Sequence, residues 1–345
     1  MPRDLRGGAL VATSAKAAKA RQQRTATSLR SGRSFDFVGR SRLFMYVSLG
    51  LIALCALGLV LRGLNFGIDF TGGTAFVVEG ATGDFTAEDL EQALAAQGID
   101  EVAVQLSEGD QGVGALIRTP SLDEIGGSEQ SALVDTIAEV TGAPAENVAV
   151  SAVGPRWGAQ VSRQALYGLL VFLVLVVAYI SFRFEWRMAI TAIVTLLHDV
   201  LVTIGIYSIV GFEVTPASVV ALLTILGYSL YDTVVVFDRV QENAARLTSV
   251  STETYGEVAN TSLNQVLVRS LSTSAAALLP VGSLLFIGAG LLGASTLRDL
   301  ALALFVGMAV GAYSSIFVAT PILVWLKERE PRYARLKEQV AARRR

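Results

Sequence analysis

The sequence has few charged residues, one cysteine and one histidine. Charged residues make up 17% of the 345 positions, whereas soluble proteins carry about 25%. Hydrophobic residues make up 52%, and the mean hydropathy is +0.53. Cys55 has no second cysteine to pair with, and no metal site follows from it. This composition excludes an ordinary soluble protein and indicates a membrane protein.

Six apolar segments come close to the length of about 20 residues that a membrane-spanning helix needs. They are residues 43–61, 165–182, 188–210, 214–236, 270–292 and 300–326. The fifth segment is diluted by Ser272, Thr273, Ser274 and Pro280, but neighbouring helices can satisfy such residues within a bundle. We therefore predict an α-helical polytopic membrane protein with six spans.

The charges are distributed unevenly, which predicts the orientation of the chain. Residues 1–42 contain ten Lys or Arg against two acidic residues, whereas residues 64–163 contain sixteen Asp or Glu against three Arg. The tail at 327–345 is basic again. Because Lys and Arg stay on the cytoplasmic side, we expect both termini to be cytoplasmic and the acidic loop to lie outside.

These features divide the chain into five parts. A basic cytoplasmic tail at 1–42, mostly disordered, precedes a first span at 43–63 that reads as an uncleaved signal anchor. The extracytoplasmic domain follows at 64–163, and then a five-span bundle at 164–326. The second basic cytoplasmic tail, at 327–345, ends the chain.

The extracytoplasmic segment shows alternating strand and helix signals. Strands are predicted at 74–80, 102–107, 114–119 and 147–153, with helices at 86–98 and 128–142. Thr86 and Asp89 have the spacing of a helix N-cap and its partner. The order βαββαβ is typical of a ferredoxin-like α+β domain. That fold hosts many functions, so it indicates none by itself.

Ionisable residues occur inside the predicted spans. Asp199, next to His198, lies in the third span, and Asp232 lies in the fourth. Arg269 stands at the predicted entrance of the fifth span, at a depth close to that of Asp232 and about 10 Å from that of Asp199. Intramembrane ionisable residues mark proton relays or ion pathways. Two interpretations stay open: a relay in which Arg269 controls protonation of Asp232, or a permanent ion pair that fixes helix packing.

Small residues repeat at every fourth position of the sixth span, at Gly307, Gly311 and Ser315. This pattern lets two helices approach closely. A contact within the bundle is the favoured interpretation, and a surface for a partner subunit is the alternative.

Several motifs together resemble a known family. "GIDFTGGT" (67–74) follows the first span, "VGPRWG" (153–158) precedes the second, and "GYSLYDTVVVFDRVQENA" (227–244) covers Asp232. With "NQVLVRSLSTS" (264–274) and "VGAYSSIFVATPILVWL" (310–326), they resemble the SecF subunits of bacterial SecD–SecF protein-export complexes. The resemblance spans residues 35–327.

The resemblance implies a fold and a function. The fold is one half of a resistance-nodulation-division type membrane protein in the bacterial cell membrane. SecD is the implied partner, beside membrane lipid, the Sec channel (SecY, SecE and SecG) and the unfolded chains exported through it; no nucleic acid is expected. The proton gradient would drive late steps of translocation, without a cofactor, a metal or an enzymatic reaction.

Specific residues carry this resemblance. The family's membrane aspartate and arginine match Asp232 and Arg269, which are implied to form the proton relay, with Asp199 and His198 as further relay or supporting groups. Tyr231 departs from the family pattern, which often has Asn there, so the family's route of proton access does not carry over directly to this chain. The other motif residues are Gly67, Asp69, Gly72, Gly73, Gly154, Pro155, Asp238 and Arg239.

Two other functions remain as alternatives. A proton-driven exporter of small molecules or lipids from the same superfamily would share the fold, although those proteins usually carry both halves in one chain. An intramembrane aspartyl protease would use Asp199 and Asp232 as a catalytic dyad. A dyad needs two carboxyl groups close enough to share a proton, and the predicted difference in depth opposes this.

Overall fold

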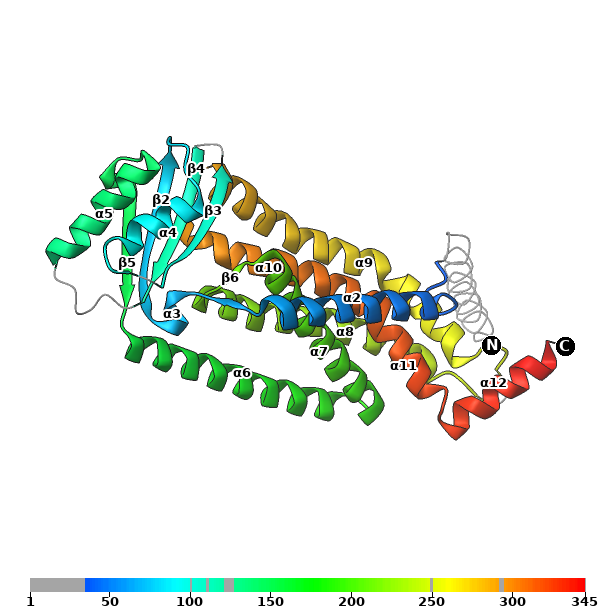
Figure 1. The fold of residues 1–345 in the computed structure, drawn as a ribbon. Coiled ribbons are helices and arrows are strands. Elements are labelled where there is room, and N and C mark those ends of the chain that lie inside the picture. Colours follow the sequence, from blue (N-terminus) through cyan, green and yellow to red (C-terminus); the bar gives the residue numbers. More distant parts are fainter. Residues whose placement is uncertain are drawn as a thin grey trace, which may run out of the picture.

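The computed structural model describes residues 35–344, apart from residues 100, 110–111, 121–126, 249–250 and 292–294. A bundle of long helices carries a small sheet domain at one end, which we call the domain end (Figure 1). The opposite end, which we call the tail end, holds the start of the first long helix and the C-terminus (Figure 1). Most of the tail at 1–42, for which disorder was predicted, lies outside the described residues.

Six helices of the described residues are long and apolar enough to cross a membrane, as predicted. They are α2 (Ser41–Arg62), α6 (Pro155–Arg183), α7 (Trp186–Val210), α8 (Pro216–Ala244), α9 (Tyr255–Ser283) and α10 (Ser295–Ser314). A π-helical segment, η3 (Ser315–Ala319), joins α10 to α11 (Thr320–Lys327), and a second, η2 (Leu284–Leu291), continues α9.

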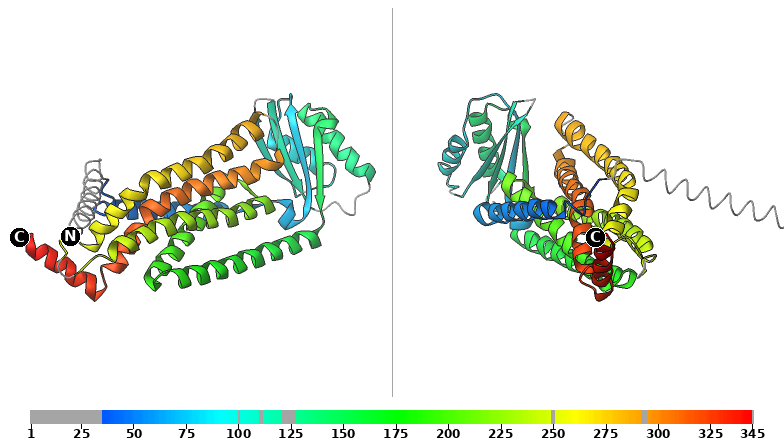
Figure 2. Two further views of the ribbon diagram at one scale, coloured as in Figure 1. Left: turned by 180° about the vertical axis from the view of Figure 1, so that it is seen from behind. Right: turned by 90° about the vertical axis from the view of Figure 1, so that its right-hand side faces the viewer.

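Helices α7, α8 and α10 form the interior of the bundle. Within an apolar stretch of 18 residues in each helix, the share that is buried inside this chain is 56% for α7, 39% for α8 and 50% for α10 with its extension. The corresponding share is 11% for α2, α6 and α9, which lie at the periphery (Figure 2). The outer faces of the peripheral helices are therefore left for lipid or for another protein.

Three helices extend well beyond the predicted spans, by about eight residues or more. Helix α8 continues to Ala244, so Asp238 and Arg239 do not mark its end, and α9 begins at Tyr255, well before the predicted start at residue 270. Thr254 caps α9 in a reciprocal capping box with Glu257, which is a polar start signal that hydropathy does not register. Helix α6 begins at Pro155, inside the range assigned to the sheet domain.

The sheet domain confirms the predicted βαββαβ order. Its elements are β2 (Gly73–Ala81), α4 (Ala87–Ala95), β3 (Ala103–Gly109), β4 (Gly112–Thr119), α5 (Gly127–Thr141) and β5 (Val148–Val153). The strands pair antiparallel in the order β3-β4-β2-β5. Both helices pack on one sheet face, where Leu90 and Ile137 meet Phe76 and Ile117 in one apolar core. Thr86 caps α4 as predicted.

The basic tail after residue 326 is largely helical. Helix α12 (Pro331–Arg343) buries Tyr333, Leu336 and Val340 against the bundle. Its charged residues reach the start of α9, where Arg344 lies 2.7 Å from Glu257. The tail therefore packs on the tail end of the bundle.

Candidate functional site

Asp232 lies at the centre of a polar site between three helices. Its side chain belongs to α8, and the residue is 4% exposed. Ser270 of α9 donates a hydrogen bond to Oδ2 at 2.6 Å, and Ser315 of η3 donates to the same oxygen at 2.5 Å. The π-helical turn at Ser315 matters because such turns inside longer helices occur frequently at functional sites. The carboxylate thus joins α8, α9 and the α10 extension.

Asp199 forms a second buried polar cluster. Ser229 of α8 donates a short hydrogen bond to Asp199 Oδ2, and His198 Nδ1 lies 3.1 Å from Oδ1. The Asp199 side chain is fully buried, and that of His198 is 3% exposed. Ser229 precedes Asp232 by three residues on α8, which is an axial rise of about 4.5 Å. The predicted separation in depth of about 10 Å was therefore too large.

The small residues of α10 pack against the same face of α8. A Cβ atom added at Gly307 would lie 2.3 Å from Ile225 Cδ1, and one at Gly311 would lie 3.0 Å from Ser229 Cβ. The next residue of the row, Ser315, reaches Asp232. The interpretation of this row as a contact within the bundle is confirmed. Its close approach brings the Ser315 hydroxyl to the carboxylate.

Arg269 and Tyr231 lie on the outer surface beside the Asp232 site. Arg269 is exposed, and its Nη2 donates a hydrogen bond to the Tyr231 hydroxyl at 3.4 Å. Tyr231 itself is 53% exposed. Among the described residues, Asp232 and Arg269 form no ion pair, so the predicted direct pairing is not present in this arrangement. Arg269 directly precedes Ser270, which hydrogen-bonds to Asp232, but the Arg269 side chain lies on the exposed surface.

The glycine motif after the first span forms a tight joint at the domain end. Gly67 caps the short helix α3 (Ile68–Thr71), and a Cβ atom there would lie 2.6 Å from Glu213 Oε1. Gly73 has φ +130°, and a Cβ atom there would lie 2.5 Å from the Thr119 carbonyl oxygen. Glycine is required at position 73, where φ is positive and the near atom is backbone, whereas a side chain at position 67 would need the Glu213 side chain to move.

The joint also holds the start of the second span. Gly154 and Pro155 begin α6. A Cβ atom at Gly158 would lie 2.8 Å from the Phe70 carbonyl oxygen and 2.9 Å from the Gly72 nitrogen. Helix α6 is therefore packed directly against the turn that leads into the sheet.

The connection between α7 and α8 is tied to this joint. Strand β6 (Glu213–Val214) pairs in parallel with β1 (Asn65–Phe66). Arg118 of β4 donates to the Asn65 side chain at 2.6 Å and to the Phe66 carbonyl at 2.9 Å. It also lies 3.9 Å from Glu213. The sheet domain is thus connected to the end of the helix that carries Asp232.

Burial has an electrostatic consequence at Glu213. Removal from water raises the pKa of the Glu213 carboxyl, and the positive charge of Arg118 opposes that shift. Asp299 and Asp69 raise the pKa further. Burial and the two acidic neighbours therefore favour the protonated form of Glu213.

Two motif residues lie near the tail end of α8. Asp238 forms an ion pair with Arg183 at 2.7 Å, with both side chains about half exposed. Arg239 donates to Gln265 of α9 at 2.7 Å. These contacts tie α8 to α6 and α9, and they do not touch the Asp232 carboxylate.

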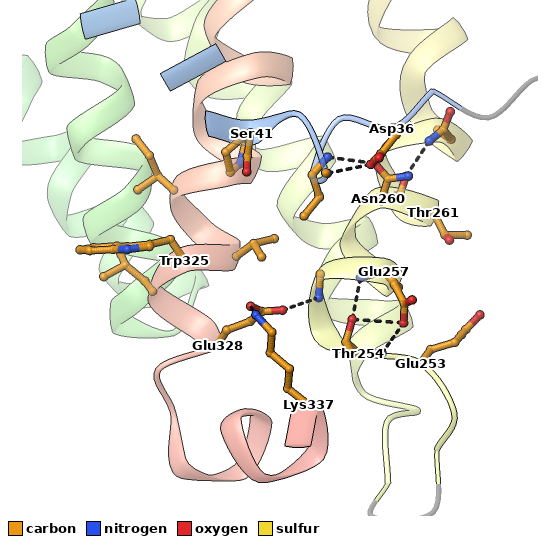
Figure 3. A pocket seen from close by; sticks show the side chains of 18 of the residues that line it. Asp36, Ser41, Glu253, Thr254, Glu257, Asn260, Thr261, Trp325, Glu328 and Lys337 are labelled. Carbon is orange, nitrogen blue, oxygen red and sulfur yellow. Dashed lines mark hydrogen bonds and ion pairs between the residues drawn. The ribbon is translucent and has the colours of Figure 1, made fainter. Parts of the chain in front are cut away.

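A wide groove of about 1930 Å³ lies at the tail end, and Asp232 is not among the residues that line it. Asp36, Asn260, Glu257, Glu328 and Lys337 are among the side chains that line it (Figure 3). Several charged groups in the groove form ion pairs, as in the contact of 2.5 Å between Lys337 and Glu328. Asn260 accepts from the Phe37 nitrogen at 2.8 Å and so holds the segment before α2. These contacts indicate packing of the tails.

Sequence reasoning missed three serines and one arginine. Ser270, Ser315 and Ser229 donate to the two buried carboxylates. Ser315 was noted only as a small packing residue and Ser270 only as the start of a span. Arg118 could have been singled out, since it is one of three basic residues at 64–163.

Comparison with known proteins identifies the family. The family described as protein export membrane protein SecD/SecF, C-terminal, matches residues 133–329, which is more than half of the chain. The chain belongs to the SecD/SecF family. The SecD/SecF GG motif matches residues 58–82, which include Gly67 and Gly73 of the domain-end joint.

Relatives of this SecD/SecF chain are similar over most of its length. The protein translocase subunit SecF of Streptomyces coelicolor is 44% identical over 90% of this chain and 81% of its own. The SecF subunit of Desulfurispirillum indicum is 34% identical over 88% of this chain and 97% of its own. The sequence expectation of a SecF-type chain is confirmed.

Solved structures confirm the fold. The crystal structure of SecDF from Thermus thermophilus, titled a translocon-associated membrane protein, matches with a TM-score of 0.74 and 36% identity. The match covers 86% of this chain and 39% of that one. This chain therefore spans about two fifths of the SecDF chain and shares the fold of the matched part. It is a multi-pass membrane protein.

Proposed function

We propose that this SecD/SecF-family chain is an accessory subunit of Sec protein export that works with SecD and uses the proton gradient to drive late steps of translocation. The observation that carries the proposal is the buried Asp232 carboxylate, held by hydroxyl groups from two other helices. Relatives named as SecF or SecDF translocase subunits support the export role.

The donors at Asp232 favour a relay over a structural ion pair. A hydroxyl can donate to a carboxylate and can also accept from a protonated carboxyl group. Ser270 and Ser315 can therefore satisfy Asp232 in both protonation states, which a lysine or arginine partner could not do. A carboxylate is costly in the membrane, and these hydroxyl groups can bind both its ionised and its protonated form. Such a carboxylate suits proton transfer.

The outward position of Arg269 supports a partner at this face. The residue lies near the middle of the candidate span Tyr255–Gly288, on an exposed surface with Val268 and Leu271. An arginine at the centre of a lipid-facing helix costs about 2.5–3.5 kcal/mol on insertion scales. SecD would remove that cost by covering the face, and it would turn Arg269 into a control element for Asp232. Purified alone in vesicles, the chain should not conduct protons.

The remaining assignments follow from this proposal. The sheet domain lies outside and both termini are cytoplasmic, in agreement with the uneven charge of the chain. The domain end then faces the Sec channel, formed by SecY, SecE and SecG, and the unfolded chains leaving it. Lipid covers the outer faces of α2 and α6. The proton gradient is the only energy source, and the chain catalyses no reaction on its partners.

Export into membrane vesicles tests this function. Vesicles carry SecD with the wild-type chain, with Asp232→Asn, or with Glu242→Gln, which removes an exposed carboxylate from the same helix. Asp232→Asn should assemble with SecD but lose the stimulation of export by a proton gradient, whereas Glu242→Gln should retain it. Normal gradient-dependent export by an assembled Asp232→Asn complex would make Asp232 a packing residue.

A further inference from the structure

Three buried polar atoms in the domain-end half of α7 have no hydrogen-bond partner. Among the described residues, they are His198 Nε2, Thr203 Oγ1 and the Tyr207 hydroxyl. Each of the three residues is at most 5% exposed. An unsatisfied buried polar group costs about 1–3 kcal/mol, and native proteins contain few of them. Three on one helix therefore require an explanation, and bound water is the usual one.

The spacing along α7 fits bridging water molecules. Asp199, Thr203 and Tyr207 follow one another at intervals of four residues, so they lie on one helix face about 6 Å apart. This is the spacing of the backbone positions, and water molecules making hydrogen bonds of about 2.8 Å would bridge the side-chain oxygens between them. Water between Asp199 and Thr203, and between Thr203 and Tyr207, would complete a continuous hydrogen-bonded row.

The row is connected at both of its ends. At the domain end, the Tyr207 ring lies 5.4 Å from that of Phe212, and the Phe212 nitrogen donates to the Tyr207 carbonyl at 3.0 Å. Phe212 directly precedes Glu213 in the chain. At the inner end, Asp199 accepts from Ser229, which is one helical turn from Asp232. The row therefore runs from the domain end of α7, near Glu213, to the Asp232 site.

We propose that internal water molecules bound by His198, Asp199, Thr203 and Tyr207 form the outer half of a proton path within this chain, leading from the domain end of α7 to Asp232. This water row is distinct from Asp232 and Arg269, and its use for transport rests on the proposed function. Each transfer breaks one O–H bond and forms another along the row. Asp199 holds the proton between the water row and Ser229, and no other reactant is consumed.

Isosteric variants separate bound water from unpaired hydroxyl groups. Thr203→Val and Tyr207→Phe each remove one of the unpartnered oxygens with little change in shape. If these oxygens are dry, their removal relieves a penalty, and the unfolding midpoint of the complex with SecD stays the same or rises. If they bind water, the midpoint falls. Thr195→Val is the matched control, since the Thr195 hydroxyl donates to the Thr191 carbonyl within α7.

The same variants are measured for proton uptake in vesicles that contain the complex. We expect Thr203→Val to slow uptake about tenfold, which corresponds to about 1.4 kcal/mol at the limiting transfer. Thr195→Val should not slow it. Infrared difference spectra should lose a water O–H band in Thr203→Val and retain it in Thr195→Val.

The outcomes distinguish the two proposals. If Asp232→Asn abolishes uptake while Thr203→Val changes neither uptake nor the water band and does not lower the midpoint, the proposed function stands and the water row is wrong. If the wild-type complex takes up no protons, the proposed function fails. The unfolding midpoint and the infrared water band of Thr203→Val then still show whether water is bound on α7.

Discussion

The Arg118 contact at the domain-end joint allows a quantitative prediction. Arg118 donates two hydrogen bonds, at 2.6 Å and 2.9 Å, and lies 3.9 Å from Glu213. The side chains of Arg118 and Glu213 are 13% and 20% exposed, so water screens this contact only weakly. A hydrogen bond to a charged group contributes about 1.5–3 kcal/mol. Arg118→Ala should therefore lower the free energy of unfolding by about 3 kcal/mol or more.

Thermal unfolding of the purified chain, followed by tryptophan fluorescence, measures this loss. Arg163→Ala is the control, because Arg163 is exposed and hydrogen-bonds only to nearby Tyr167 among the described residues. The double variant Arg118→Ala with Glu213→Gln should recover part of the loss, since a neutral amide at position 213 no longer needs the cation. An unchanged midpoint for Arg118→Ala, or strictly additive effects in the double variant, would refute the role of this contact.

Three further results are expected. Burial raises the pKa of Glu213 above 4.5. The stabilisation that Glu213 contributes should therefore be complete below pH 4.5 and be lost as the pH rises through the raised pKa of the folded chain. Unfolding midpoints measured across this pH range should vary less with pH in Glu213→Gln than in the wild-type chain. Ser315→Ala removes one donor to Asp232 and should slow gradient-dependent export about tenfold, whereas Ser314→Ala, whose hydroxyl donates to a backbone carbonyl, should not. Thr86→Ala should destabilise the sheet domain by about 1 kcal/mol through loss of the helix cap, as seen in its unfolding transition.

The parts of the fold set by local pattern were predictable from the sequence. Alternation of apolar residues and the Thr86 cap indicated the βαββαβ domain, and long apolar runs indicated six spans. Hydropathy reports where a helix meets lipid, not where it ends. The polar extensions of α8 to Ala244 and of α9 back to Tyr255 were missed for this reason.

The sequence predicted the carboxylates of the candidate site but not their hydrogen-bond partners. Asp199 and Asp232 stood out because charge is rare in the spans. Their hydrogen-bond partners depend on how each helix is rotated about its axis, which periodicity does not determine when the whole span is apolar. The expected pairing of Asp232 with Arg269 failed on this point, because α9 turns Ser270 toward the carboxylate and Arg269 toward Tyr231.

Asp232 should gain and lose a proton when a gradient is imposed, and on this step the proposed function depends most. Infrared difference spectroscopy of the complex with SecD in vesicles tests it directly, because protonated and ionised carboxyl groups absorb at different frequencies. A gradient should produce a carboxyl signal that is absent in Asp232→Asn and unchanged in Glu242→Gln. A carboxyl signal that persists in the Asp232→Asn complex, or no signal in a wild-type complex that exports normally, would contradict the account.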